Sequence, residues 1–148
     1  MTTSHGSSGS KAADTFSTIV IFLGAVAFAA FGLKWLVNPA AMAGPLGIVL
    51  TNGDATSDAR AVYGGMELGL GVFLAYSGAS KERRTQGLAA AAIVLCGLGC
   101  SRLIGILLGG GVSSGTYALL GTDLGGTALC ATAFFVSRAA GLRSPSLA

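Results

Sequence analysis

Five ionisable side chains lie within or at the ends of apolar stretches of the sequence, and their types could do chemistry. They are Lys34, Arg60, Glu67, Arg102 and Asp123. A charged group at the centre of a membrane helix costs about 2.5–3.5 kcal/mol on insertion scales, so such groups normally face protein partners or a water-filled cavity. We therefore expect these side chains to converge inside a helical bundle.

The stretch around Glu67 is central to this expectation. At about 3.6 residues per turn, Arg60, Tyr63 and Glu67 fall on one face of an α-helix, together with Gly64 and Gly71. Tyr63 could donate a hydrogen bond into a pocket, or it could be one of the tyrosines that membrane proteins place at the lipid–water interface. The sequence leaves both roles open.

Depth in the membrane suggests which charges pair. Glu67 with Arg102, and Arg60 with Asp123, are the expected ion pairs, because the members of each pair lie at similar depths. Such pairs could form a structural clamp that sets the register of the helices. They could instead line a polar pocket that opens to the outside and binds a small polar ligand or relays protons. Because bases outnumber acids, that pocket is expected to lean slightly toward an anion.

Other kinds of chemistry are not expected. The only histidine, His5, lies in a polar tail, so no membrane segment can ligate haem or a metal ion through histidine. Cys96, Cys100 and Cys130 lie in apolar segments and form no CxxC motif, so we expect free thiols that serve as small packing residues. No cofactor and no catalytic residue is predicted.

Composition places the chain among membrane proteins. Hydrophobic residues make up 52% of the 148 residues and charged residues only 10%, whereas a soluble domain carries about 25% charged residues. The net charge is +3, but the basic residues flank apolar segments and form no stripe on a soluble domain. A nucleic-acid partner is therefore excluded, and the lipid bilayer is the expected partner.

Four apolar segments are long enough to cross a bilayer, which predicts an all-α bundle of four transmembrane helices in one domain, residues 15–138. Residues 1–14 are expected to be a disordered tail and residues 139–148 a short cytoplasmic tail. Lys34 and Trp35 lie near the end of the first span, where a lysine can snorkel and an indole suits the interface. The predicted spans are residues 16–37, 58–77, 86–108 and 116–137.

Small residues at four-residue spacing predict where helices pack closely, since they allow backbones to approach. The third span carries the longest such ladder, so another helix should pack against it. Between the first two spans, residues 46–50 form a short apolar patch that rests on the bundle mouth or dips into the interface. The predicted packing residues are Gly65, Gly69, Gly97, Ser101, Gly105, Gly121 and Gly125.

The loop of residues 78–85 carries Lys81, Arg83 and Arg84, and basic loops stay in the cytoplasm. This placement puts both termini in the cytoplasm as well. Glu67, Arg102 and Asp123 then all lie in the outer half of the membrane, with Lys34 and Arg60 near its outer surface.

Two short runs and one acid resemble a known family. They are RAVYGGMELGLG at residues 60–71, SRLIG at residues 101–105, and Asp123 early in the last span. The sequence is similar to domain of unknown function family 4345, whose members are small four-helix integral membrane proteins, mostly bacterial. The resemblance implies this fold and a bacterial inner membrane, with Asp123 where the family is expected to carry a glutamate. It implies no reaction, because the family has no established activity.

The function expected from these features is that of a non-enzymatic, multi-pass membrane protein. Its charged pocket, in the outer half of the membrane, would bind a small ligand, a lipid headgroup or a proton. One alternative is a structural accessory subunit whose glycine-rich faces pack in a larger membrane complex or a homo-oligomer. A further alternative is a membrane oxidoreductase or a lipid-modifying enzyme.

Overall fold

The computed structural model describes residues 5–109 and 111–142, and all regular secondary structure in these ranges is helical. The predicted all-α fold is therefore confirmed. The elements in chain order are α1 (His5–Val37), α2 (Pro39–Ala43), the 3₁₀ helix η1 (Gly44–Leu46), α3 (Gly53–Ala59), the π-helix η2 (Arg60–Met66), α4 (Glu67–Gly78), α5 (Lys81–Gly109) and α6 (Ser114–Leu142).

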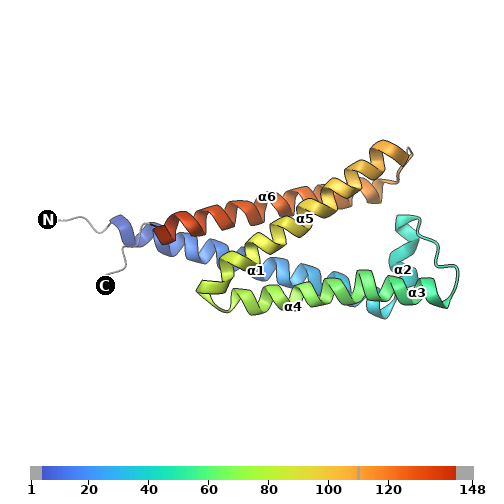
Figure 1. Cartoon of the computed structure of the whole chain (residues 1–148), viewed down its shortest axis with the longest axis horizontal. Helices are drawn as coiled ribbons and strands as arrows, with labels where there is room; N and C mark the ends of the chain where they lie inside the picture. Colours follow the sequence, from blue (N-terminus) through green and yellow to red (C-terminus); the bar gives the residue numbers. More distant parts are fainter. Residues whose placement is uncertain (1–4, 110, 143–148) are drawn as a thin grey trace.

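The helices form two pairs. In one pair, α1 packs along η2 and α4, and in the other α5 packs along α6. The pairs meet where α1 begins and α4 passes into α5, and they diverge toward the opposite end, as Figure 1 shows. We call the first end, which holds Asp14, Lys81 and Arg84, the basic end. The end that holds Trp35, Arg102 and Asp123 is called the open end.

Glycine allows the backbones of α1 and α4 to touch. A Cβ atom on Gly71 would lie 2.7 Å from the backbone nitrogen of Ala29 and 2.9 Å from the carbonyl oxygen of Ala25. Near the basic end, a Cβ on Gly87 would lie 2.6 Å from the Cβ of Ser77, which brings α5 against α4. These positions exclude any larger side chain, so they fix how closely the helices approach.

The small residues that were expected to pack against a neighbouring helix do not lie at the helix contacts. A Cβ on Gly65 would reach only the Arg60 carbonyl oxygen of its own helix, and Ser101 is exposed. At the other five positions, a Cβ would meet no atom of another helix within 4 Å in the described residues: Gly69, Gly97, Gly105, Gly121 and Gly125. The predicted contacts are thus not made among the described residues. The contact between α5 and α6 instead uses Gly99 against Leu124 and Gly126 against Leu95. Spacing alone did not show which face of each helix meets its neighbour.

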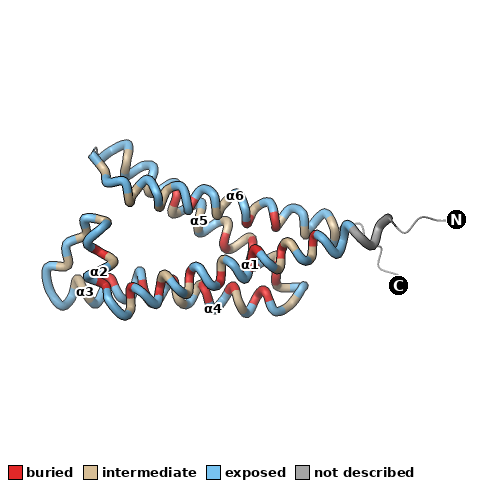
Figure 2. Tube along the Cα trace, turned by 180° about the vertical axis from the view of Figure 1, so that it is seen from behind, coloured by how far each residue is buried: buried red, intermediate tan, exposed pale blue. Residues whose placement is uncertain are grey.

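Buried residues form two clusters, which Figure 2 shows in red along the helix contacts. The larger lies where the two helix pairs meet and includes Ile21, Leu74, Leu88 and Ala133. The smaller lies at the open end, where Ala43 and Ala59 pack around the fully buried Trp35, with Leu46, Ile48 and Leu50 against them. The apolar patch at residues 46–50 therefore rests on the bundle mouth, as one of the two expectations had it.

Among the described residues, three helices are long and apolar enough to cross a membrane: Gly9–Val37, Lys81–Gly109 and Ser114–Gly141. Their outward faces carry exposed apolar side chains such as Ile93, Leu107 and Leu108, which are more than 70% exposed. This surface is compatible with a membrane protein. Helix α1 begins at His5, so the described part of the expected disordered tail is helical, and Asp14 accepts a hydrogen bond from Arg84. Residues 1–4 lie outside the described residues. The last predicted tail residues, 143–148, lie outside the described residues.

Candidate functional site

A cavity of about 460 Å³ lies between the two helix pairs at the open end. That volume is in the range of small-molecule sites, which run from about 300 to 1,000 Å³. Most of its lining is aliphatic or aromatic, contributed by α1, α5 and α6 with Leu46 and Ile48 at the mouth. The side chains with polar atoms in the lining are Trp35, Tyr63, Glu67, Arg102, Thr116, Thr122 and Asp123.

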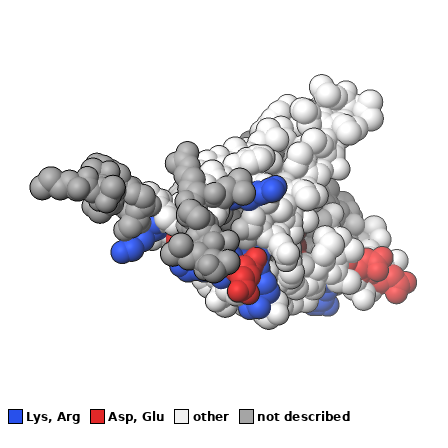
Figure 3. Space-filling view, turned by 60° about the vertical axis from the view of Figure 1, so that its left-hand side comes forward, with Lys and Arg blue, Asp and Glu red and all other residues white. Residues whose placement is uncertain are grey.

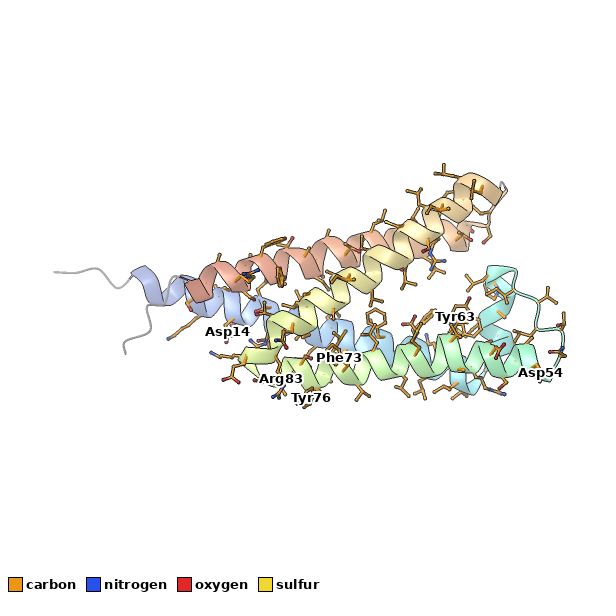
Figure 4. All side chains as sticks on the ribbon, in the orientation of Figure 1. Asp14, Asp54, Tyr63, Phe73, Tyr76 and Arg83 are labelled. Atoms are coloured by element: carbon orange, nitrogen blue, oxygen red, sulfur yellow. The ribbon has the colours of Figure 1, made fainter. Side chains whose placement is uncertain are left out.

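The π-helix decides which residues of the second helix reach this cavity. A π-helix bonds residue i to i+5 and so turns the residues before it relative to those after it. Tyr63 and Glu67 line the cavity, and Figure 4 shows Tyr63 on the side of its helix that faces α5. Arg60 instead is exposed, and its Nε donates to the carbonyl oxygen of Leu36 at 3.1 Å. The predicted single face of Arg60, Tyr63 and Glu67 assumed regular α-helical spacing throughout.

The Arg60 side chain therefore caps the end of α1 and does not line the cavity. The last four carbonyl groups of an α-helix have no partner within the helix, and Leu36 lies in the last turn of α1. The Arg60 guanidinium satisfies one of these groups. Lys34 is exposed and does not line the cavity either.

The cavity contains one ion pair, and it is not one of the two expected pairs. The Nε of Arg102 donates to Oδ2 of Asp123 at 2.9 Å, with Asp123 only 6% exposed. Both residues belong to the α5–α6 pair, so this ion pair does not connect the two helix pairs. The predicted pairs of Glu67 with Arg102 and of Arg60 with Asp123 are thus wrong. Of the four residues that depth had paired, Glu67, Arg102 and Asp123 line the cavity and Arg60 does not, and depth could not show which of them are adjacent.

Glu67 faces the Arg102–Asp123 pair from the opposite wall of the cavity. It is 8% exposed, and in residues 5–109 and 111–142 no lysine or arginine nitrogen lies within 4.0 Å of its carboxylate. No hydrogen bond to the Glu67 side chain is formed within those ranges. The charged lining of the cavity therefore consists of two acids and one base. This reverses the expected lean toward an anion, because Lys34 and Arg60 are not part of the site.

Trp35 is the feature of the site that the sequence did not identify as a pocket residue. Its side chain is fully buried and stacks on Tyr63, with ring centroids 4.7 Å apart. Its Nε1–H has no acceptor among the described residues. A buried donor without a partner costs about 1–3 kcal/mol, and buried indoles usually find a partner. Proximity to the end of the first span suggested an interfacial tryptophan, but the α2–η1 segment covers it.

The three cysteines are free thiols in the structure. Cys96 and Cys100 are free and exposed, with their sulfur atoms 4.0 Å apart, while the free thiol of Cys130 lies on the cavity wall. In the part of the chain that the structure describes, no three His, Cys, Asp or Glu side chains cluster closely enough to hold a metal ion.

Comparison with known protein families gives a match. The family model described as a domain of unknown function (DUF4345) matches residues 16–134. That range includes every residue that lines the cavity. No curated protein and no solved structure gives a significant match.

Proposed function

The chain belongs to the DUF4345 family of domains of unknown function, and from that membership we propose a four-span protein of the bacterial inner membrane with both termini in the cytoplasm. The span predicted at residues 58–77, which is added here to the three long helices, lies in the continuous helix of residues 53–78, roughly 39 Å long at about 1.5 Å per residue. Lys11, Lys81, Arg83, Arg84 and Arg138 cluster at the basic end, which favours a cytoplasmic position for that end.

Cysteine labelling tests this topology. Ser80 and Ser113 are changed singly to cysteine in a background that lacks Cys96, Cys100 and Cys130. A membrane-impermeant thiol reagent added to intact cells should label position 113 and leave position 80 unlabelled until the membrane is opened. Labelling of position 80 from outside, or of both positions alike, would refute the arrangement.

We propose further that the cavity binds a small amphiphile whose head group is a hydroxyl or an amine. One observation carries this proposal: an indole N–H and a carboxylate, each without a partner among the described residues, line the same largely apolar cavity. A hydroxyl can accept from Trp35 and donate to Glu67, and an ammonium can donate to Glu67 with the help of its charge. The aliphatic lining supplies the surface for an apolar chain of the ligand.

The only tryptophan of the chain lines the cavity, so its fluorescence reports directly on occupancy. Bromine quenches indole fluorescence on contact. In detergent, a long-chain alcohol and a long-chain alkylammonium that carry bromine should quench Trp35 in a saturable way, and the matching brominated carboxylate should bind more weakly. Lys34→Gln is the control, because Lys34 precedes Trp35 but is exposed outside the cavity. Linear, non-saturable quenching with no preference among the three probes would refute the proposal.

The open glycines support a second candidate function, that of an accessory subunit packed against another membrane protein or a second copy of the chain. Gly97 and Gly105 on α5 and Gly121 and Gly125 on α6 leave helix surface that the bundle itself does not cover. In mild detergent, Gly105→Leu should then dissociate the assembly, while Ile104→Leu, a change at the exposed neighbour, should not. A wild-type chain that is monomeric in native membranes would exclude this candidate.

A further inference from the structure

A second cavity, of about 300 Å³, lies at the basic end and is independent of the site described above. It is formed by the beginning of α1, the beginning of α5 and the end of α6, which are ends of the three helices long enough to cross a membrane. Its lining includes three bases, Lys11, Lys81 and Arg84, and a single acid, Asp14. Figure 3 shows lysine and arginine gathered around this end of the molecule, beside a flank that is almost free of charge.

Arg84 anchors the cavity and is only 8% exposed. Its Nη1 donates to Oδ1 of Asp14 at 2.6 Å and to the Asp14 carbonyl oxygen at 3.3 Å, and its Nη2 donates to the carbonyl oxygen of Gly78 at 3.3 Å. Lys81 adds a second contact to Asp14 at 3.1 Å. One carboxylate is thus shared by two bases, which leaves the cavity with an excess of positive charge.

Two buried donors in this lining have no partner among the described residues. They are the Nε–H of Arg84 and the hydroxyl of Ser137. Burying a donor without an acceptor is costly, so such a pair marks a place where an acceptor from outside the chain can bind. An oxygen-rich anion supplies several acceptors at once and offsets the excess positive charge.

We propose that this cavity binds a phosphate group, as carried by the headgroup of an anionic phospholipid. Basic pockets between membrane helices are suited to such headgroups. The position of the cavity favours a lipid over a free ion, because helix ends lie at the depth of the headgroups. There the phosphate would contact Ser137, Arg84 and Lys11, and the exposed apolar faces of the membrane-length helices would hold the acyl chains.

The test measures binding of a short-chain phosphatidylglycerol to the full chain in detergent, by native mass spectrometry and by thermal unfolding. Inorganic phosphate and a short-chain phosphatidylcholine are the parallel probes. We expect phosphatidylglycerol to bind and to stabilise the chain, and both other probes to do so much less. Lys11→Gln and Ser137→Ala remove a charge and a hydroxyl without touching the contacts of Arg84 with Asp14. Lys11→Gln should weaken phosphatidylglycerol binding about fivefold, the loss that corresponds to one basic residue near anionic lipid.

Lys34→Gln is the matched control, because it removes an exposed lysine from the opposite end of α1 and should leave the affinity unchanged. An equal loss of affinity in Lys34→Gln would overturn the proposal, since the effect would then be one of overall charge. Equal stabilisation by inorganic phosphate would also overturn it in favour of a free-anion site. Equal binding of phosphatidylcholine, or unchanged affinity in both Lys11→Gln and Ser137→Ala, would show that the cavity does not select the anionic headgroup.

Discussion

The two ends of the bundle carry the same kinds of charged side chain and use them differently. At the basic end, Asp14 on α1 binds Arg84 and Lys81 at the beginning of α5, so the ion pairs cross from one helix pair to the other. At the open end, Arg102 and Asp123 bind each other within the α5–α6 pair. Figure 4 labels Asp14 at the basic end and Tyr63 toward the open end, where the helix pairs have separated.

This difference matches the separation of the helix pairs, because the cavity of about 460 Å³ at the open end exceeds that of about 300 Å³ at the basic end. Arg84 joins α5 to Asp14 on α1 and to the carbonyl oxygen of Gly78 on α4, and Gly87 approaches Ser77 closely nearby. The ion pair of Arg102 with Asp123 lies within the α5–α6 pair, so it does not hold the two helix pairs together. Glu67 and Trp35 on the facing wall have no partner from this chain in the described residues, and under the proposed function the ligand supplies one.

Breaking the crossing contacts should have the largest effect. Arg84→Gln removes the guanidinium that joins Asp14 and Gly78, and Arg84 is nearly buried. Removing one partner of a buried ion pair costs about 3–5 kcal/mol, and the partial exposure of Asp14 favours the lower end of that range. Thermal unfolding in detergent measures the loss.

Lys81→Gln is the control at the same site. The Lys81 side chain is 77% exposed, so its contact with Asp14 should contribute no more than about 1 kcal/mol. Lys81→Gln could instead destabilise the chain as much as Arg84→Gln. The stability of the basic end would then depend on its overall charge and not on the bonds that Arg84 makes across the helix pairs.

A double-mutant cycle sharpens the comparison at the open end. Arg102→Gln and Asp123→Asn should each destabilise the chain by about 2 kcal/mol, because each leaves a charge without its partner. The double variant should recover part of the loss, with a coupling energy of about 0.5–3 kcal/mol. The corresponding cycle of Arg102→Gln with Glu67→Gln should be close to additive. Strong coupling in that second cycle would mean that Glu67 and Arg102 interact and act as a clamp between the two helix pairs.

Glycines that pack and glycines that do not should respond oppositely to alanine. Gly71→Ala places a methyl group against the backbone of α1 and should cost about 1–3 kcal/mol in the free energy of unfolding. Gly97→Ala meets no atom of this chain in the described residues and should stabilise α5 by at most about 1 kcal/mol. Destabilisation by Gly97→Ala in the isolated chain would mean that the outer face of α5 is packed.

Much of the fold could be predicted from the sequence. The length of the apolar segments and the scarcity of charged residues predicted the long helices. The turn at Ser80 lies within the predicted loop of residues 78–85, although α5 begins already at Lys81. Patterns of this kind depend on the local sequence. The cost of burying a charge picked out five side chains, of which Glu67, Arg102 and Asp123 line one cavity and Lys34 and Arg60 do not.

The details that were missed depend on three-dimensional relations. The π-helix moved Arg60 away from Glu67, and no residue spacing reveals a π-helix in advance. The small residues of α5 repeat regularly on a face that turns away from α6. Trp35 became a pocket residue because a short helix and a 3₁₀ turn cover it, a long-range contact that periodicity does not encode.

The most direct test of the open end as a binding site is Glu67→Gln, measured for stability and for binding together. Glu67 has no counter-ion in the described part of the chain, so the variant should unfold at an unchanged or higher temperature. Its affinity for the brominated alkylammonium, read from the quenching of Trp35, should fall about tenfold or more, as expected for the loss of a hydrogen bond to a charged group. A variant that loses stability and keeps the wild-type affinity would contradict the binding site and establish Glu67 as a structural residue.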